Sequence, residues 1–228
     1  MYYTEKGFYY LSISALNLVF GSFYCDEVAL KPKEIVSVLA TATMFQLDGL
    51  IEQCAQVMLE TLNTETVVQY YIAAHEYGLT ELKNECVNWL LVNLTGRFYS
   101  TDHFERLRTI PKSLMITLIS HPDLCVLKTE IILYTMLVQW MYLQLHLKDE
   151  IPSVKVIENY FSSRNKKTPF LSTESGKPFV QIFKALRLTH MTLHNMDIKL
   201  ILMDNIIPVF WIHRVVFDQW KIVLRFVF

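Results

Sequence analysis

The chain has 228 residues, with 21 Lys or Arg against 22 Asp or Glu and a formal net charge of −1. This near-neutral balance excludes a general nucleic-acid or membrane-surface binder, because such proteins need a basic excess. With 52% hydrophobic and 19% charged residues, the composition also excludes intrinsic disorder. It leaves a protein that hides surface against a partner, a membrane protein, or a fragment of a larger protein.

Two uncharged stretches, at residues 7–25 and 131–147, bear on the membrane alternative. Polar residues interrupt both stretches, and the second is shorter than the ~20 apolar residues that a membrane span needs. We therefore expect no membrane span. Residues 23–25, at the end of the first stretch, and residues 28–30, just after it, form two short apolar segments. Their shortness predicts extended backbone rather than helix.

The apolar spacing of residues 33–62 is mostly three and four residues, which predicts two helices broken near Gln46 and Gly49. Residues 64–94 show the same pattern, with a break at residues 77–80 and Thr80 as the expected N-cap of the second helix.

These two segments form an internal repeat with a constant offset of 32 residues. The matched positions are Ala42, Phe45, Leu47, Leu50 and Cys54, which correspond to Ala74, Tyr77, Leu79, Leu82 and Cys86. A period near 32 residues is typical of stacked helix pairs. We interpret the repeat as one helical hairpin used twice, in which the small residue lets two helices approach and the aromatic residue closes the turn.

Beyond residue 95 the apolar spacing predicts further helices at residues 104–107, 111–119, 130–145, 179–188, 191–203 and 208–228. Thr129 is placed to cap the apolar helix that begins at Glu130. The most polar stretch, residues 148–176, is expected to be an exposed loop.

No catalytic constellation is recognisable. The cysteines Cys25, Cys54, Cys86 and Cys125 form no CxxC pair, so we expect reduced thiols rather than a zinc ribbon or a disulfide framework. Nucleophile-elbow and phosphate-loop motifs are also missing. We therefore predict no enzymatic activity, no cofactor and no metal.

One alternative is a metal site in the C-terminal part of the chain. His190 and His194 would share a face of a helix, and Asp197 follows three residues later, so the three could bind a metal ion. A surface helix explains the same spacing, because no further ligand cluster accompanies them.

One run of residues resembles the last third of a BTB/POZ domain. It consists of Phe20-Gly21-Ser22-Phe23-Tyr24 followed by Val28, Ile35, Leu39, Ala42, Leu47, Leu50 and Cys54. The chain after it resembles the BACK domain, through residues 64–94 and then Phe104, Leu107, Leu118, Leu124, Val126, Glu130 and Trp140. The fold implied is mainly α: the C-terminal part of a BTB/POZ fold followed by an α-helical BACK domain of stacked helical hairpins.

A more specific resemblance, over residues 12–224, is to the germ cell-less family. It is carried by Gln46-Leu47-Asp48-Gly49-Leu50-Ile51, Tyr77-Gly78-Leu79, Ser175-Gly176-Lys177-Pro178-Phe179-Val180 and Leu186-Arg187-Leu188. The implied domains are a partial BTB/POZ domain at residues 1–62, a BACK domain at 63–147, and a polar loop with a C-terminal helical extension at 148–228. Because the family pattern starts near Ser12, we expect truncation at both ends, with Ala42 and Cys54 partly uncovered.

The resemblance implies a non-enzymatic scaffold that acts as a substrate adaptor of a cullin-3 ubiquitin ligase in germ-cell development, including spermatogenesis. Its implied partners are cullin-3, an unidentified ubiquitination substrate, nuclear-envelope proteins and a second copy of the chain. The implied location is the nucleus, its envelope or matrix, or the cytoplasm. Two alternatives stay open: a nuclear-envelope or transcription-factor binding protein without cullin activity, and a non-functional fragment.

The residues carried over as a protein-interaction site lie on the first BACK helix pair, where the family supports its cullin contact. They are Val67, Tyr70, Tyr71, His75, Tyr77 and Glu81.

Overall fold

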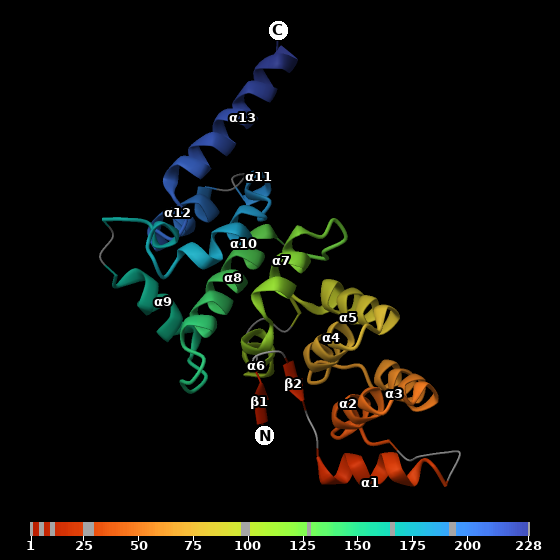
Figure 1. The fold of residues 1–228 in the computed structure, drawn as a ribbon. Coiled ribbons are helices and arrows are strands. Elements are labelled where there is room, and N and C mark those ends of the chain that lie inside the picture. Colours follow the sequence, from red (N-terminus) through yellow and green to blue (C-terminus); the bar gives the residue numbers. More distant parts are fainter. Residues whose placement is uncertain are drawn as a thin grey trace. The chain divides into compact units, whose positions relative to one another are not determined.

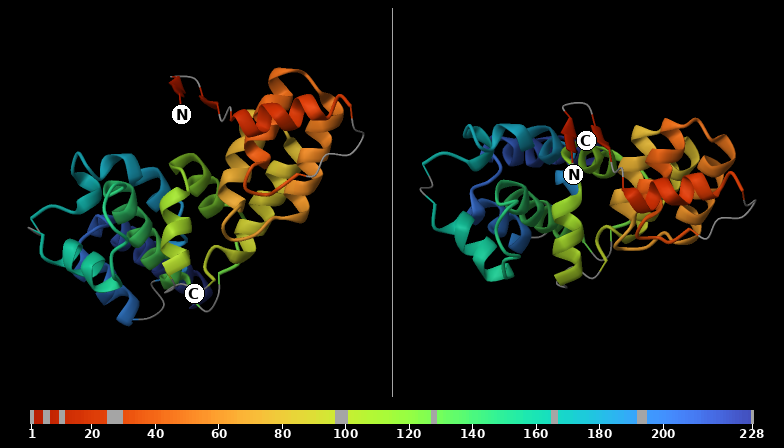
Figure 2. Two further views of the ribbon diagram at one scale, coloured as in Figure 1. Left: turned by 90° about the horizontal axis from the view of Figure 1, so that it is seen from below. Right: turned by 60° about the horizontal axis from the view of Figure 1, so that its bottom comes forward.

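The computed structural model is built almost entirely of helices and divides into two compact units, Met1–Leu90 and Leu91–Phe228. Figures 1 and 2 show the helices of both units. The mainly α expectation is therefore confirmed. The residues that the structure describes are 2–4, 7–9, 12–24, 30–96, 101–126, 129–164, 167–191 and 195–227.

The first unit begins with a short antiparallel hairpin of β1 (Tyr2–Thr4) and β2 (Gly7–Tyr9). Its helices are α1 (Ile13–Gly21), α2 (Ile35–Met44), α3 (Asp48–Glu60), α4 (Val67–Glu76) and α5 (Thr80–Asn93), of which residues 91–93 already belong to the second unit. Helix α1 begins at Ser12, whose hydroxyl accepts a hydrogen bond of 3.0 Å from the Ala15 amide and so satisfies one free N–H of the first turn.

The repeated helical hairpin is confirmed at the level of hydrogen bonds. In the α2–α3 turn the Leu47 amide donates to the Ala42 carbonyl at 3.0 Å, and in the α4–α5 turn the Leu79 amide donates to the Ala74 carbonyl at 2.9 Å. Each bond satisfies a carbonyl that a helix end would otherwise leave unpaired. The same local sequence pattern therefore builds the same turn twice.

Several expectations for the first unit need correction. Ala42 and Cys54 are not partly uncovered, since both are 0% exposed: α2, which carries Ala42, packs against α1, α3 and α4, and α3, which carries Cys54, packs against α2. Phe23 and Tyr24 lie in a turn after α1 rather than in extended backbone, because the Tyr24 amide bonds back to the Gly21 carbonyl. Thr80 is the first residue of α5 rather than the cap before it. Residues 25 and 28–29 of the expected extended pieces lie outside the described part of the chain.

The second unit is built around α8 (Glu130–Leu145), which buries side chains on all sides. Helices α6 (Thr101–Thr109), α9 (Val154–Ser162) and α11 (Leu188–Met191) pack against it. The other elements of the unit are α7 (Lys112–Ser120), η1 (Phe170–Ser172), η2 (Lys177–Phe179), α10 (Val180–Lys184), α12 (Asn195–Asp204) and α13 (Val209–Val227). Trp140, fully buried on α8, donates its indole N–H to the Ile110 carbonyl at 3.0 Å. A helix buried all round is the usual centre of a helical domain.

Expectations for the second unit also change, and one of them is the helix expected at residues 179–188, which is divided among η2, α10 and α11. Residues 148–176 are not one exposed loop, because α9 lies within them and buries Ile157 and Phe161. Their four-residue spacing gives α9 an apolar face in spite of the polar residues around it. Thr129 does precede α8 at the N-cap position, but its side chain makes no capping hydrogen bond.

Two arginine side chains, the buried Arg106 and the half-buried Arg187, bind backbone carbonyls in this unit. Arg106 is 7% exposed and donates to the Asn93 and Leu94 carbonyls at 3.1 and 3.4 Å, which satisfies acceptors at the end of α5. Arg187 donates to the carbonyls of His121 and Pro122, both at 3.1 Å.

Candidate partner-binding site

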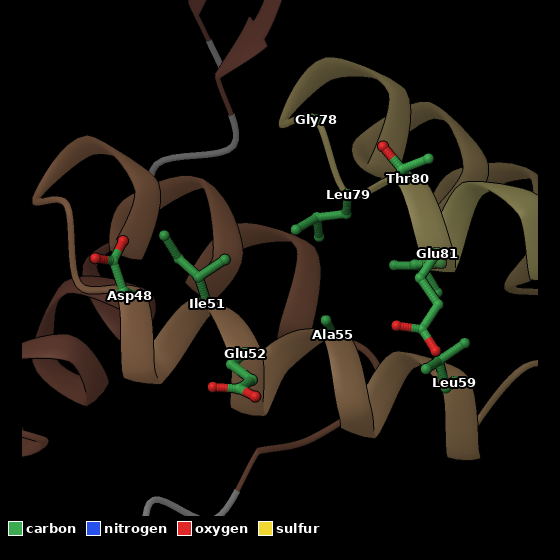
Figure 3. A pocket seen from close by; sticks show the side chains of 10 residues that line it. Asp48, Ile51, Glu52, Ala55, Leu59, Gly78, Leu79, Thr80 and Glu81 are labelled. Carbon is green, nitrogen blue, oxygen red and sulfur yellow. The ribbon is translucent and has the colours of Figure 1, made fainter.

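An open groove of about 520 Å³ lies in the first unit, between α3 and the turn that leads into α5. Figure 3 shows the side chains of α3 facing those of this turn across the groove. The groove is lined by Asp48, Ile51, Glu52, Ala55, Leu59, Gly78, Leu79, Thr80, Glu81 and Leu82. Both copies of the repeat contribute to it, because α3 belongs to the first hairpin and residues 78–82 to the second.

The groove combines an apolar floor with an acidic rim. The apolar floor consists of Ile51, Ala55 and Leu59 of α3, which are half-buried and spaced four residues apart on one face of the helix. Asp48, Glu52 and Glu81 are exposed, and the lining contains no Lys or Arg. Three carboxylates around an apolar floor favour a partner segment that carries apolar side chains and a positive charge.

A second exposed feature of the same unit is an aromatic patch at the end of α1 and the α2–α3 turn. The Phe20 ring lies 6.1 Å from that of Phe23 and 5.7 Å from that of Phe45, between ring centroids. Phe20 and Phe23 are 47% and 56% exposed, and the neighbouring Tyr24 is 89% exposed. Clustered exposed aromatic side chains are typical of surfaces that bind another protein.

The six residues expected from sequence fall into two groups. Val67, Tyr70 and Tyr71 are buried in the hairpin core. The Tyr70 hydroxyl is 3.0 Å from the Thr61 hydroxyl, and burial raises the pKa of Tyr71.

His75 and Glu81 are exposed and Tyr77 is half-buried. Of the six, Glu81 alone lines the groove. The α3 residues of the floor were not among the site residues expected from the sequence, although their four-residue apolar spacing could have indicated them.

The comparisons with known proteins agree with this architecture. The BTB/POZ domain family matches residues 10–62. The chain is 37% identical to protein germ cell-less of Drosophila melanogaster over 94% of its own length. It is 38% identical to the human germ cell-less protein-like 1, again over 94% of its length. The chain resembles the germ cell-less proteins along nearly its whole length and carries a match to the BTB/POZ domain.

This germ cell-less-like chain spans 42% of the length of the fly and human proteins that it matches. A weaker similarity, 27% identity over 57% of the chain and 21% of the relative, is to a kelch repeat and BTB domain-containing protein 8 of Xenopus tropicalis. The BTB match followed by further helical hairpins fits a BTB/BACK arrangement. This resemblance supports a protein-interaction scaffold.

The candidate ligands of the alternative metal site lie on different elements of this germ cell-less-like chain. His190 is exposed on α11 and Asp197 lies on α12, while His194 falls outside the described residues. Within the described part, no group of three or more His, Cys, Asp or Glu side chains is placed to hold a metal ion. In the same part, no helix has the length and apolar character to cross a membrane.

Proposed function

We propose that the chain is the cullin-binding part of a non-enzymatic ubiquitin-ligase adaptor, with the groove between α3 and α5 as its contact for cullin-3. The observation that carries this proposal is the groove itself, where the first two helical hairpins meet around an apolar floor. From the family resemblance we expect α4 and α5 to support the cullin contact, and Glu81 of α5, which lines the groove, is consistent with this expectation.

The chemistry of the groove suits an inserted peptide segment better than a small substrate. Its apolar floor is a row of side chains one helical turn apart, and its carboxylates lie at the rim, where they are exposed to solvent. A segment with apolar side chains buries them against Ile51, Ala55 and Leu59, while a Lys or Arg beside them meets Glu52 or Glu81. The aromatic patch of Phe20, Phe23 and Phe45 supplies a second contact on the same unit.

The test is a binding measurement between the full chain and the N-terminal part of cullin-3 by isothermal titration calorimetry. Ala55→Glu places a longer, charged side chain in the groove and should weaken binding about tenfold or more. Gln53→Glu adds the same charge to α3 at an exposed position that does not line the groove, and should leave the affinity nearly unchanged. A folded chain that does not bind cullin-3 overturns the proposal.

The patch and the groove can be separated in the same assay. Phe20→Ser with Phe23→Ser removes the exposed aromatic side chains without touching the groove. If this double variant loses binding and Ala55→Glu does not, the cullin contact lies at the patch and the assignment of the groove is wrong.

The developmental role and the location belong to the proposal as well. The relatives are named germ cell-less proteins, and these names support a role in germ cells. We also propose a nuclear or nuclear-envelope location. Fluorescence microscopy of the tagged chain in germ cells tests both, and exclusion of the protein from the nucleus overturns the second.

A further inference from the structure

Helix α13, in the second unit, carries a short sequence repeat that the function proposed above does not use. Residues 209–215 read Val-Phe-Trp-Ile-His-Arg-Val and residues 216–222 read Val-Phe-Asp-Gln-Trp-Lys-Ile. Valine, phenylalanine, a ring side chain, a basic residue and a β-branched residue therefore recur after seven residues. A seven-residue apolar repeat is the pattern of a helix that pairs lengthwise with another helix.

The structure shows that the repeated side chains face away from the unit to which α13 belongs. Ile212 is only 4% exposed, and the Gln219 side chain donates to the Thr189 carbonyl at 2.7 Å, so these two residues attach α13 to its own unit. Phe210, Phe217 and Trp220 are instead 66%, 51% and 56% exposed. The rings of Phe217 and Trp220 lie 6.2 Å apart, centroid to centroid, on adjacent turns.

A heptad assignment follows from these exposures. Phe210 and Phe217 occupy a positions, and His213 and Trp220 occupy d positions, so the four form one seam. Arg214 and Lys221 then occupy the e positions at the edge of the seam. The Lys221 ammonium lies 4.4 Å from the centre of the Phe217 ring, so this basic charge is held beside the apolar seam.

The charges on the seam decide the kind of partner. In an antiparallel pair of two α13 helices, Arg214 and Lys221 of one copy face the same residues of the other, and like charges repel. In a parallel pair they face the g positions of the other copy, Val209 and Val216, which offer no negative charge. A helix with acidic residues beside its own apolar seam satisfies both basic side chains.

We propose that the exposed face of α13 is a docking surface for an acidic amphipathic helix of another protein. A lipid surface does not require the seven-residue spacing that this face shows, since a bilayer has no matching ridges. The surface lies outside the groove in the first unit. The proposal is therefore independent of the cullin contact.

The experiment uses the full chain and a synthetic helical peptide of about four heptads with Leu at a and d and Glu at e and g. A matched peptide carries Lys in place of Glu. We expect the full chain to bind the acidic peptide about tenfold or more tightly than the basic one in fluorescence anisotropy. Equal affinity for both peptides, or no affinity for either, overturns the proposal.

Protein variants locate the binding face. Arg214→Glu with Lys221→Glu should reverse the preference so that the basic peptide binds more tightly, and Phe210→Ser with Phe217→Ser should weaken binding of both peptides. Ile222→Ser removes an apolar side chain of the same helix that is 54% exposed but lies off the seam, and should leave binding unchanged. If Ile222→Ser weakens binding as much as the Phe variants, the seam is wrongly assigned.

Two further measurements address the other possible occupants. Sedimentation that shows a dimer, abolished by the Phe variants, identifies a second copy as the occupant and overturns the proposal. Cosedimentation with anionic vesicles but no peptide binding identifies a membrane surface and also overturns it. Circular dichroism of each variant confirms that the exposed substitutions leave the fold intact.

Discussion

Gln46 and Gly78 occupy the same position in the two copies of the repeated turn, and both adopt left-handed backbone with φ of 57° and 73°. Each directly follows the aromatic residue at the C-cap of a helix, Phe45 after α2 and Tyr77 after α4. Glycine adopts this conformation freely, whereas a residue with a Cβ pays a steric cost. One copy of the turn is therefore strained and the other is not.

Replacing Gln46 by Gly should stabilise the protein, because the exposed Gln46 side chain gives up little contact and the backbone strain is relieved. We expect the free energy of unfolding to rise by about 0.5–1 kcal/mol in urea denaturation. Gly78→Ala should lower it by a similar amount, since a Cβ is strained there. Gly49→Ala, within α3 and with open space around it, serves as the control and should stabilise.

Gly176 should not tolerate a side chain. A Cβ at this position meets the Phe170 carbonyl oxygen and comes within 2.8 Å of the Leu171 Cα, and all of these are backbone atoms that cannot rotate away. Gly176→Ala should therefore destabilise the second unit by about 2–4 kcal/mol, measured by urea denaturation. Gly21→Ala has nothing within 4 Å and is the matched control. An equal, small effect of both substitutions would contradict the predicted clash.

His103 should make stability depend on pH. It is 1% exposed with Nδ1 3.2 Å from an Arg106 nitrogen, and burial together with the Arg106 charge lowers its pKa to about 4. Between the ordinary pKa of 6.5 and 4, the unfolded chain binds this proton and the folded chain does not. Stability contributed by neutral His103 is therefore present above pH 6.5 and is lost as pH falls toward 4, by up to about 3 kcal/mol.

Urea denaturation at pH 7 and pH 5 measures this loss. His103→Gln cannot titrate, so its free energy of unfolding should fall less between the two pH values than that of the natural chain. His190→Gln, at an exposed histidine of the same unit, should keep the full dependence. An unchanged dependence in His103→Gln would show that other groups carry it.

The described thiols should differ sharply in reactivity. Burial raises the pKa of both Cys54 and Cys86 to about 12, and neither side chain is exposed, whereas Cys125 is exposed. Because the thiolate is the nucleophile, iodoacetamide at pH 7.5 should modify Cys125 and spare Cys54 and Cys86 until denaturant is added. Peptide mass mapping gives the sites. Rapid modification of Cys54 in the native protein would show that this side chain is not buried in the hairpin core.

Local patterns in the sequence predicted the helical hairpins well. The matched pairs Ala42 with Ala74 and Leu47 with Leu79 identified the repeated turn, because a turn between two helices is held by bonds among residues a few positions apart. The bounds of α8 were also predicted, since its apolar residues continue from Glu130 to Leu145 with only scattered polar ones between them. Helix α9 was missed because its two buried residues, Ile157 and Phe161, stand among polar ones.

For the candidate sites too, some features followed from the local sequence and others depended on the tertiary structure. The sequence by itself determined a helical scaffold, its repeat and its family resemblance, because these depend on spacing along the chain. Only the tertiary structure decided that Tyr70 and Tyr71 are buried while Ile51 and Leu59 line a groove, and that Phe210 and Phe217 face solvent. Spacing shows that apolar residues share one face of a helix, but whether that face is covered depends on elements distant in the chain.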